Sequence, residues 1–227
     1  MDHLILLAGG SGERAGEGPN KVYRSLDSAP LLSYPLQAIR SFNQPVRLVV
    51  VARKEDRPLL DQLLVSFADL NPKVVLGGTT RYQSEKAGLA AIRPRDGELI
   101  GIHDGARPFL TAHLWEACRA KAELVGGAIP VVDPGPMFRN TNRQLRELSG
   151  VMKAQTPQIF DAVHLAEAFE QSAQPGFDTA ETVTRSSDVT IGVVAGDDRN
   201  IKVTTTSDFE RAVALVGQWA PEGWLLP

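Results

Sequence analysis

The stretch Leu4-Ile5-Leu6-Leu7-Ala8-Gly9-Gly10-Ser11-Gly12-Glu13-Arg14-Ala15-Gly16 decides the fold of this chain. Its first four residues are apolar at consecutive positions, which is typical of a strand buried on both faces of a parallel sheet. The glycine-rich segment that follows therefore lies at the carboxyl end of a strand, where open α/β sheets hold their ligands. We expect an α/β protein whose binding site is built around this first loop.

The loop has the composition of a polyphosphate cradle. Glycines let successive backbone N–H groups turn toward an anion without a Cβ in the way. Arg14 and Lys21 add positive charge beside these groups. We therefore predict that Arg14 and Lys21 act on a bound polyphosphate, and that the loop itself holds it through Ala8, Gly9, Gly10, Ser11 and Gly12.

Three better-known glycine motifs fit the loop less well. A P-loop requires glycine before its lysine, but Lys21 follows Asn20. The dinucleotide fingerprint requires a helix to open at its third position, and the glycines and proline of residues 16–19 would break that helix. A serine-hydrolase elbow around Ser11 would need glycine in place of Glu13. A flexible turn without a ligand is the remaining alternative.

Composition limits what the chain can bind. Its 227 residues carry a formal net charge of −3, and the basic residues are spread along the sequence. This gives no electrostatic footprint for nucleic acid. The single cysteine, Cys118, lies in a helical pattern and is interpreted as a small buried apolar residue, so neither a disulfide framework nor a cysteine metal site is expected. The sequence predicts no metal-ligating residues.

The chain is expected to be one cytoplasmic domain spanning residues 1–227. Its first residues lack the basic region of a targeting segment, and no apolar run approaches the ~20 residues of a membrane span. A chain of this length suits a single α/β unit. We therefore expect no interaction with a membrane.

Strand and helix patterns alternate along the chain. Such alternation predicts right-handed crossovers and a mostly parallel, doubly wound sheet of the Rossmann-like kind. Strand patterns cover residues 4–7, 47–51, 73–76, 98–102, 127–132 and 189–194, and helical patterns cover 31–42, 59–70, 85–92, 112–124, 161–169 and a last helix from 206.

Two further strand ends carry candidate site residues. Gly77-Gly78 follows the third strand, and Ser84 could hydrogen-bond a base or cap its own helix. The fourth strand leads into residues 103–109, where Asp104 and Gly105 are placed to meet a ribose hydroxyl or a magnesium ion. An Asp-Gly turn braced by Arg107 is the structural alternative.

The pattern changes at residues 133–150, where turn residues lie between two alternating segments. This predicts a hairpin arm that projects from the sheet. An isolated hairpin has little stability, so we expect the arm to pair with a second subunit. Farther on, Lys202 at another strand end could reach the site or be a solvated lysine.

Taken together, five motifs in this order resemble the 2-C-methyl-D-erythritol 4-phosphate cytidylyltransferase family, to which the ribitol-5-phosphate cytidylyltransferases are related. The motifs occupy residues 8–16 with 19–21, 77–84, 103–109, 154–158 and 200–204. The resemblance implies a CTP-dependent nucleotidyltransferase of non-mevalonate isoprenoid synthesis with the nucleotidyltransferase fold. It also implies a homodimer formed through the 133–150 arm, and Mg²⁺ as cofactor.

The resemblance also implies roles for individual residues. Arg14, Lys21 and Lys202 would be the catalytic cations. The cytosine would lie against Ala8, Gly9, Gly78 and Ser84, and the ribose against Asp104 and Gly105. Arg107 and Lys202 would bind the phosphate of the acceptor.

The chain departs from the family pattern in its acceptor half. Leu148 stands where the family usually has an arginine, Pro134 replaces a threonine, and Ala180 replaces an acid. Arg143, Arg146 or Lys153 could compensate. These changes leave open another polyol phosphate, such as ribitol 5-phosphate, as acceptor, or a non-catalytic nucleotide-binding protein.

Overall fold

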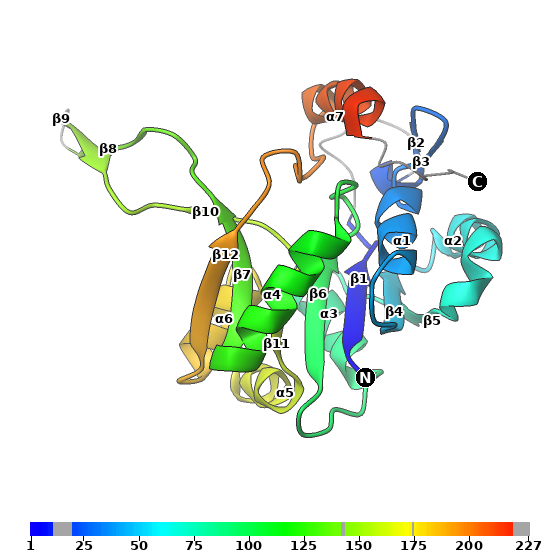
Figure 1. Ribbon diagram of the computed structural model, residues 1–227, viewed down its shortest axis with the longest axis horizontal. Coiled ribbons are helices and arrows are strands. Elements are labelled where there is room, and N and C mark those ends of the chain that lie inside the picture. Colours follow the sequence, from blue (N-terminus) through cyan, green and yellow to red (C-terminus); the bar gives the residue numbers. More distant parts are fainter. Residues whose placement is uncertain (11–19, 142–143, 174, 220–227) are drawn as a thin grey trace.

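The computed structural model of the chain describes residues 1–10, 20–141, 144–173 and 175–219. Within these residues, eight strands form one sheet that is covered by helices on both faces (Figure 1). The strands of the sheet are β1 (His3–Leu7), β4 (Arg47–Ala52), β5 (Lys73–Leu76), β6 (Leu99–Asp104), β7 (Gly126–Val132), β10 (Lys153–Ala154), β11 (Gln158–Asp161) and β12 (Thr190–Ala195).

The helices alternate with these strands along the chain. The α-helices are α1 (Ser33–Arg40), α2 (Arg57–Leu64), α3 (Arg81–Ala90), α4 (Ala112–Val125), α5 (Ala162–Gln171), α6 (Thr179–Ser186) and α7 (Thr206–Trp219). The described residues also include the 3₁₀ helices η2 (Lys21–Tyr23) and η3 (Val65–Leu70) and a short strand pair, β2 (Ser25–Leu26) with β3 (Ala29–Pro30).

The sheet is mostly parallel. Strands β5, β4, β1 and β6 pair in parallel in that order, and β12 pairs in parallel with β7. Strand β11 lies between β6 and β7 and is antiparallel to both. Strand β10 precedes β11 along the same edge of β7. The fold predicted from the alternation is therefore confirmed, with one antiparallel return strand that the pattern did not indicate.

The apolar run of β1 is buried on both faces, as its sequence predicts. Leu4 and Leu6 belong to a core shared with α1, α2 and α4, whereas Ile5 belongs to the core on the other face, shared with α3, α5 and α6. All three side chains have no exposed surface. Because successive side chains of a strand point to opposite faces, consecutive apolar residues are required here.

Helix α4 packs closely on the sheet through Trp115. Its indole ring is fully buried and stacks on Phe42, with 4.9 Å between ring centroids. A Cβ on Gly101 of β6 would lie 2.4 Å from this ring, so the position accepts only glycine without a shift of the helix. Cys118, on the same helix, is buried among these apolar residues, as expected.

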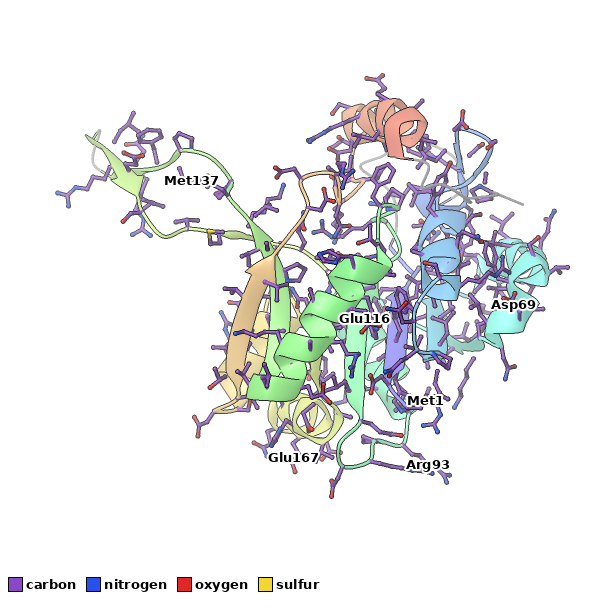
Figure 2. All side chains as sticks on the ribbon, in the orientation of Figure 1. Met1, Asp69, Arg93, Glu116, Met137 and Glu167 are labelled. Carbon is purple, nitrogen blue, oxygen red and sulfur yellow. The ribbon has the colours of Figure 1, made fainter. Side chains whose placement is uncertain are left out.

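Residues 133–150 leave the body and return to it. Strand β8 (Met137–Thr141) pairs antiparallel with β9 (Gln144–Leu148), and Figure 1 shows this hairpin projecting well away from the helical layers. Met137 lies on the projecting segment (Figure 2). The stretch from β7 through the hairpin to β10 and β11 is therefore one excursion between two neighbouring strands of the sheet.

Some boundaries differ from the sequence predictions. Helix α3 begins at Arg81 and not at Glu85, because Thr80 and Gln83 form a capping box. The helix predicted over residues 59–70 divides into α2 and η3, and α6 was not predicted. In the described part of the chain, no helix is both long and apolar enough to cross a membrane. The cytoplasmic location stays a prediction.

Candidate active site at the carboxyl edge of the sheet

The predicted site residues that the structure describes gather at one edge of the sheet. In the parallel register, Leu7 at the end of β1 lies between Val51 of β4 and Asp104 of β6. The backbone ladder continues past the strands: the Ala8 N–H donates to Val51 O at 2.7 Å, and the Gly105 N–H donates to Leu7 O at 2.9 Å. The loops after β1 and β6 are therefore fixed side by side.

The first glycine loop is described only at its beginning. Ala8 is buried, and a Cβ on Gly10 would have nothing within 4 Å. Ser11, Gly12 and Arg14 belong to residues 11–19, which lie outside the described residues. The Ala8 N–H is already bonded to Val51, so the amides left for a ligand come after Ala8. The anion-binding role of the loop stays a prediction.

Asn20 was not singled out from the sequence, yet it anchors the end of this loop. Its Nδ2 donates to Ala8 O at 2.9 Å and to Asp56 Oδ2 at 2.8 Å, and its side chain is buried. Asp56 is in turn bound by Arg53 at 2.8 Å. These contacts hold Lys21, the next residue, at the carboxyl edge in the first turn of η2. The sequence shows an asparagine directly before Lys21, but it does not show that this side chain binds Ala8 and Asp56.

The loop after β5 brings Gly78 and Ser84 to the same edge. Ser84 is buried, and its Oγ donates to Thr80 O at 3.0 Å within its own helix. The capping role considered for Ser84 is wrong, since Thr80 caps α3. A Cβ on Gly78 would meet the Gln83 side chain at 2.3 Å. Base binding by Gly78 and Ser84 stays a prediction.

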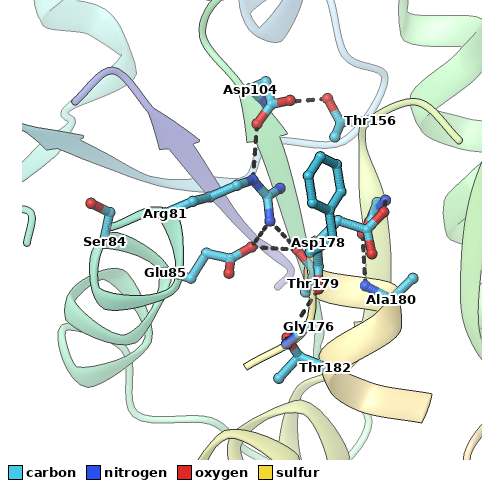
Figure 3. Close-up of polar contacts among 12 residues, drawn as sticks. Arg81, Ser84, Glu85, Asp104, Thr156, Gly176, Asp178, Thr179, Ala180 and Thr182 are labelled. Carbon is cyan, nitrogen blue, oxygen red and sulfur yellow. Dashed lines mark hydrogen bonds and ion pairs between the residues drawn. The ribbon is translucent and has the colours of Figure 1, made fainter. Parts of the chain in front are cut away.

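Asp104 is the electrostatic centre of the site. Its side chain is 9% exposed, and three cations contact it: Lys202 Nζ lies 2.8 Å from Oδ2, Arg107 Nε 3.7 Å from Oδ2, and Arg81 Nε 3.3 Å from Oδ1 (Figure 3 shows the Arg81 contact). Burial alone would raise the pKa of Asp104, but Arg81, Lys202 and Arg107 hold it well below its usual range. Asp104 is therefore a charged carboxylate surrounded by positive groups.

Backbone contacts bring Lys202 to this carboxylate. The Val203 N–H donates to Ala106 O at 2.8 Å, and Arg107 Nη1 donates to Asn200 O at 2.7 Å. Asn200 Nδ2 donates to Thr156 O at 2.9 Å. The loop after β12 is thereby fastened to the loop after β6. Asn200 and Thr156 lie within the recognised motifs, but no positioning role was assigned to them.

His103 is a structural residue of this edge. Its Nε2 lies 3.2 Å from Arg107 O, which can only accept, so Nε2 carries the proton. With the proton on Nε2, Thr156 Oγ1 donates to Nδ1 at 3.0 Å, and it accepts from the Asp104 N–H at 3.1 Å. Burial lowers the pKa of His103 to about 4. The imidazole is therefore neutral and holds the strand end in place.

A cleft of about 490 Å³ opens beside the cation cluster, between the base of the arm and the loop after β12. Its lining includes Arg107, Lys153, Asn200 and Arg211. Of the residues considered to compensate for Leu148, Lys153 therefore lines the cleft, whereas Arg146 lies on the arm and Arg143 lies outside the described residues. A cleft of similar size, about 500 Å³, opens beside His3 at the opposite edge of the sheet.

The arrangement defines an α/β protein with a cluster of cationic side chains around Asp104 at the carboxyl edge of a mostly parallel sheet. The 2-C-methyl-D-erythritol 4-phosphate cytidylyltransferase family model matches residues 3–218. The chain belongs to this family, and the resemblance drawn from its motifs is confirmed.

Relatives match over nearly the whole chain. The 2-C-methyl-D-erythritol 4-phosphate cytidylyltransferase of Bacteroides fragilis is 31% identical over 216 residues, covering 93% of this chain and 98% of its own length. That of Acaryochloris marina is 32% identical, with 95% and 94% covered. The crystal structure of 4-diphosphocytidyl-2C-methyl-D-erythritol synthase from Anaerococcus prevotii is 26% identical, with a TM-score of 0.83 and 95% and 96% covered.

The neutral state of His103 predicts a pH effect on stability. Because its pKa falls from 6.5 to about 4 on folding, the unfolded chain binds this proton more readily between those values. Acidification from pH 7 to below 4 should therefore remove about 3 kcal/mol of unfolding free energy through His103 alone.

Urea unfolding of the wild type and of His103→Gln at several pH values measures this contribution. The gap in unfolding free energy between the two proteins should narrow as the pH falls, since glutamine does not titrate. A gap that stays constant from pH 7 to pH 4 would contradict the assignment of a neutral imidazole.

Proposed function

We propose that the protein transfers CMP from CTP to the phosphate of 2-C-methyl-D-erythritol 4-phosphate and releases pyrophosphate. Membership of the cytidylyltransferase family supports the reaction class. The observation that carries the proposal is the meeting of Ala8, at the start of the first glycine loop, with Lys21 and the Asp104 cation cluster at one edge of the sheet. Such an edge suits a triphosphate and a second phosphate that must approach each other.

The chemistry requires position and positive charge more than proton transfer. A phosphate monoester has a second pKa of about 6, so near pH 7 it is already mostly dianionic and can attack without a general base. Its oxygen forms a bond to the α-phosphorus of CTP while the bond to pyrophosphate breaks. The neutral, fully paired His103 is consistent with a reaction that needs no base beside Asp104.

Each cation has a separate task in this proposal. Lys21, together with Arg14, stabilises the negative charge that develops on the α-phosphate and on the leaving pyrophosphate. Lys202 and Arg107 bind the acceptor phosphate. Asp104 directs Lys202 and contributes, with Gly105, to the ribose site. The cytosine binds at Ala8, Gly9, Gly78 and Ser84.

We further propose that Mg²⁺ is required and is delivered on the triphosphate. Within the described ranges, no group of three potential ligands could hold a metal ion. Asp104 does not fit as a ligand, because Arg81, Arg107 and Lys202 surround its carboxylate. Bound to phosphate oxygens, the ion would neutralise charge on the triphosphate.

Leu148 supports a second candidate acceptor. It pairs with Met137 on the arm and brings no charge to the cleft. A site with one cation fewer than the family pattern could accept another polyol phosphate, such as ribitol 5-phosphate. Lys153, in the cleft lining, is placed to supply the missing charge.

A screen for pyrophosphate release tests these alternatives directly. The four nucleoside triphosphates are combined with a panel of polyol phosphates, with Mg²⁺ or with EDTA. Release should require CTP, 2-C-methyl-D-erythritol 4-phosphate and Mg²⁺. If pyrophosphate is released with CTP and ribitol 5-phosphate but not with 2-C-methyl-D-erythritol 4-phosphate, ribitol 5-phosphate is the acceptor. If no pair of substrates releases pyrophosphate, a catalytic role is excluded.

Substitution of Lys21 should suppress turnover while the fold is kept. By comparison with the loss of one preorganised donor, Lys21→Ala should raise the barrier by about 3 to 4 kcal/mol, or ~10²–10³ in rate. Steady-state pyrophosphate release gives kcat, and thermal unfolding checks the fold.

Lys73→Ala is the matched control. Lys73 is an exposed lysine at the start of β5, on the opposite edge of the sheet, and its Nζ donates to Ala91 O at 2.8 Å. A near-normal kcat for Lys21→Ala would contradict the catalytic role of Lys21.

We also propose that the arm pairs with a second copy of this chain. Phe138 is 56% exposed and Leu145 is 71% exposed on the hairpin, although apolar side chains on a two-stranded hairpin gain stability only when covered. Sedimentation of the wild type at micromolar concentration should give a dimer, and Phe138→Asp with Leu145→Asp should shift it toward the monomer. A monomeric wild type would reject the arm interface.

A further inference from the structure

Glu85 is a buried carboxylate for which the proposed reaction has no direct use. It lies in the second turn of α3 and is 1% exposed. A carboxylate at this depth is costly unless it is paired and hydrogen-bonded. Its Oε1 accepts a hydrogen bond from Thr179 Oγ1 at 2.5 Å and another from Arg81 Nη1. Glu85 therefore connects α3 to the start of α6.

Arg81 is divided between two carboxylates. Its Nη1 is bound by Glu85 and lies 3.3 Å from Thr179 Oγ1, whereas its Nε donates to Asp104 Oδ1 at 3.3 Å (Figure 3). Arginine commonly binds a carboxylate with two parallel hydrogen bonds. Arg81 makes a single, long contact with Asp104 through Nε, while the hydrogen bond from Nη1 to Glu85 fixes the orientation of the guanidinium group.

This division leaves the second oxygen of Asp104 to other cations. Oδ2 lies 2.8 Å from Lys202 Nζ and 3.7 Å from Arg107 Nε. Lys202 is the most exposed of the three cations around Asp104, with 39% of its side chain exposed, against 24% for Arg81 and 8% for Arg107. Its direction therefore depends on an oxygen that Arg81 does not occupy.

We propose that Glu85 is a positioning residue of the acceptor site, which divides the guanidinium of Arg81 between two carboxylates and so keeps one oxygen of Asp104 for Lys202. The inference rests on the proposed function, in which Lys202 binds the phosphate of the acceptor. Without a hydrogen-bond acceptor at position 85, the guanidinium group of Arg81 can rotate and bind Asp104 through two nitrogens. Lys202 then loses its fixed direction.

A purely electrostatic role for Glu85 predicts the opposite result. Loss of a negative charge near the cluster would make the site more positive and would strengthen the binding of a phosphate. The KM for the acceptor would then fall in any variant without the charge. A positioning role instead depends on whether a hydrogen-bond acceptor remains at the position.

Three variants separate these roles. Glu85→Gln keeps an oxygen for Arg81 Nη1 and Thr179 Oγ1 but removes the charge. Glu85→Ala removes both, and Glu85→Leu removes both while filling the buried space. We expect Glu85→Ala and Glu85→Leu to raise the KM for the polyol phosphate about tenfold and to leave the KM for CTP within about twofold of the wild type. For Glu85→Gln, we expect both KM values to stay within about twofold of the wild type.

Thermal unfolding shows which variants are folded, and Glu85→Leu provides the test if Glu85→Ala does not fold. An equal rise in KM in all three variants, a fall in KM, or no change in the Leu variant would each overturn the proposal. A merely structural role for Glu85 would lower the unfolding temperature without a selective effect on the acceptor.

Crystal structures of the wild type and of Glu85→Leu give a readout that does not need activity. In the variant, Arg81 should bind Asp104 through two nitrogens, and Lys202 Nζ should leave Oδ2. An unchanged Lys202–Asp104 contact would overturn the positioning role even if the wild type transfers CMP. Failure of the wild type to act on any polyol phosphate would instead reject the proposed function, and the structures would still test Glu85.

Discussion

The carboxylate of Asp104, buried at the end of a central strand, is the constraint on which the carboxyl edge depends. A charged group in this position is stable only if positive partners reach it. Those partners come from three separate segments: Arg81 from the first turn of α3, Arg107 from the turn after β6, and Lys202 from the loop after β12. The cation cluster therefore assembles only when the sheet has folded and has brought these three segments together.

The three cations are not held equally. Arg81 has a second anchor at Glu85, and Arg107 has one at the carbonyl of Asn200. Lys202 is more exposed than either, and its contact to Asp104 is the shortest of the three. The cluster therefore combines one partly exposed ammonium group with two more deeply buried guanidinium groups, each of which has a second anchor.

Much of this edge could be predicted from the sequence, because the carboxyl ends of parallel strands meet at one edge whatever the details of packing. The positions after β1, β5 and β6 were identified in this way. The partners of those residues could not be identified, because they lie far away in the sequence: Glu85 and Thr179 are 94 positions apart, and Asn20 bonds to Asp56 across 36. Such pairs are set by tertiary packing, which periodicity does not report.

Local sequence signals that were overlooked explain other differences between the predicted and the observed helices. Thr80 and Gln83 form a capping box that was present in the sequence, and its omission moved the predicted start of α3 by one turn. Asp178, which accepts from the Glu181 N–H, is a similar N-cap signal for α6. Both helices begin at the site, and their first residues, Arg81 and Thr179, meet at Glu85.

The reversed direction of β11 has a consequence for the density of polar groups at this edge. In a fully parallel sheet, each strand contributes only the residues that follow its carboxyl end. Strand β11 instead has its beginning on the same side, so Thr156 lies beside Asp104 at the end of β6, and Gln158 pairs with Ile102 and donates to Asp178. The antiparallel strand β11 thus adds polar groups to the carboxyl edge that a parallel strand in its place would not supply.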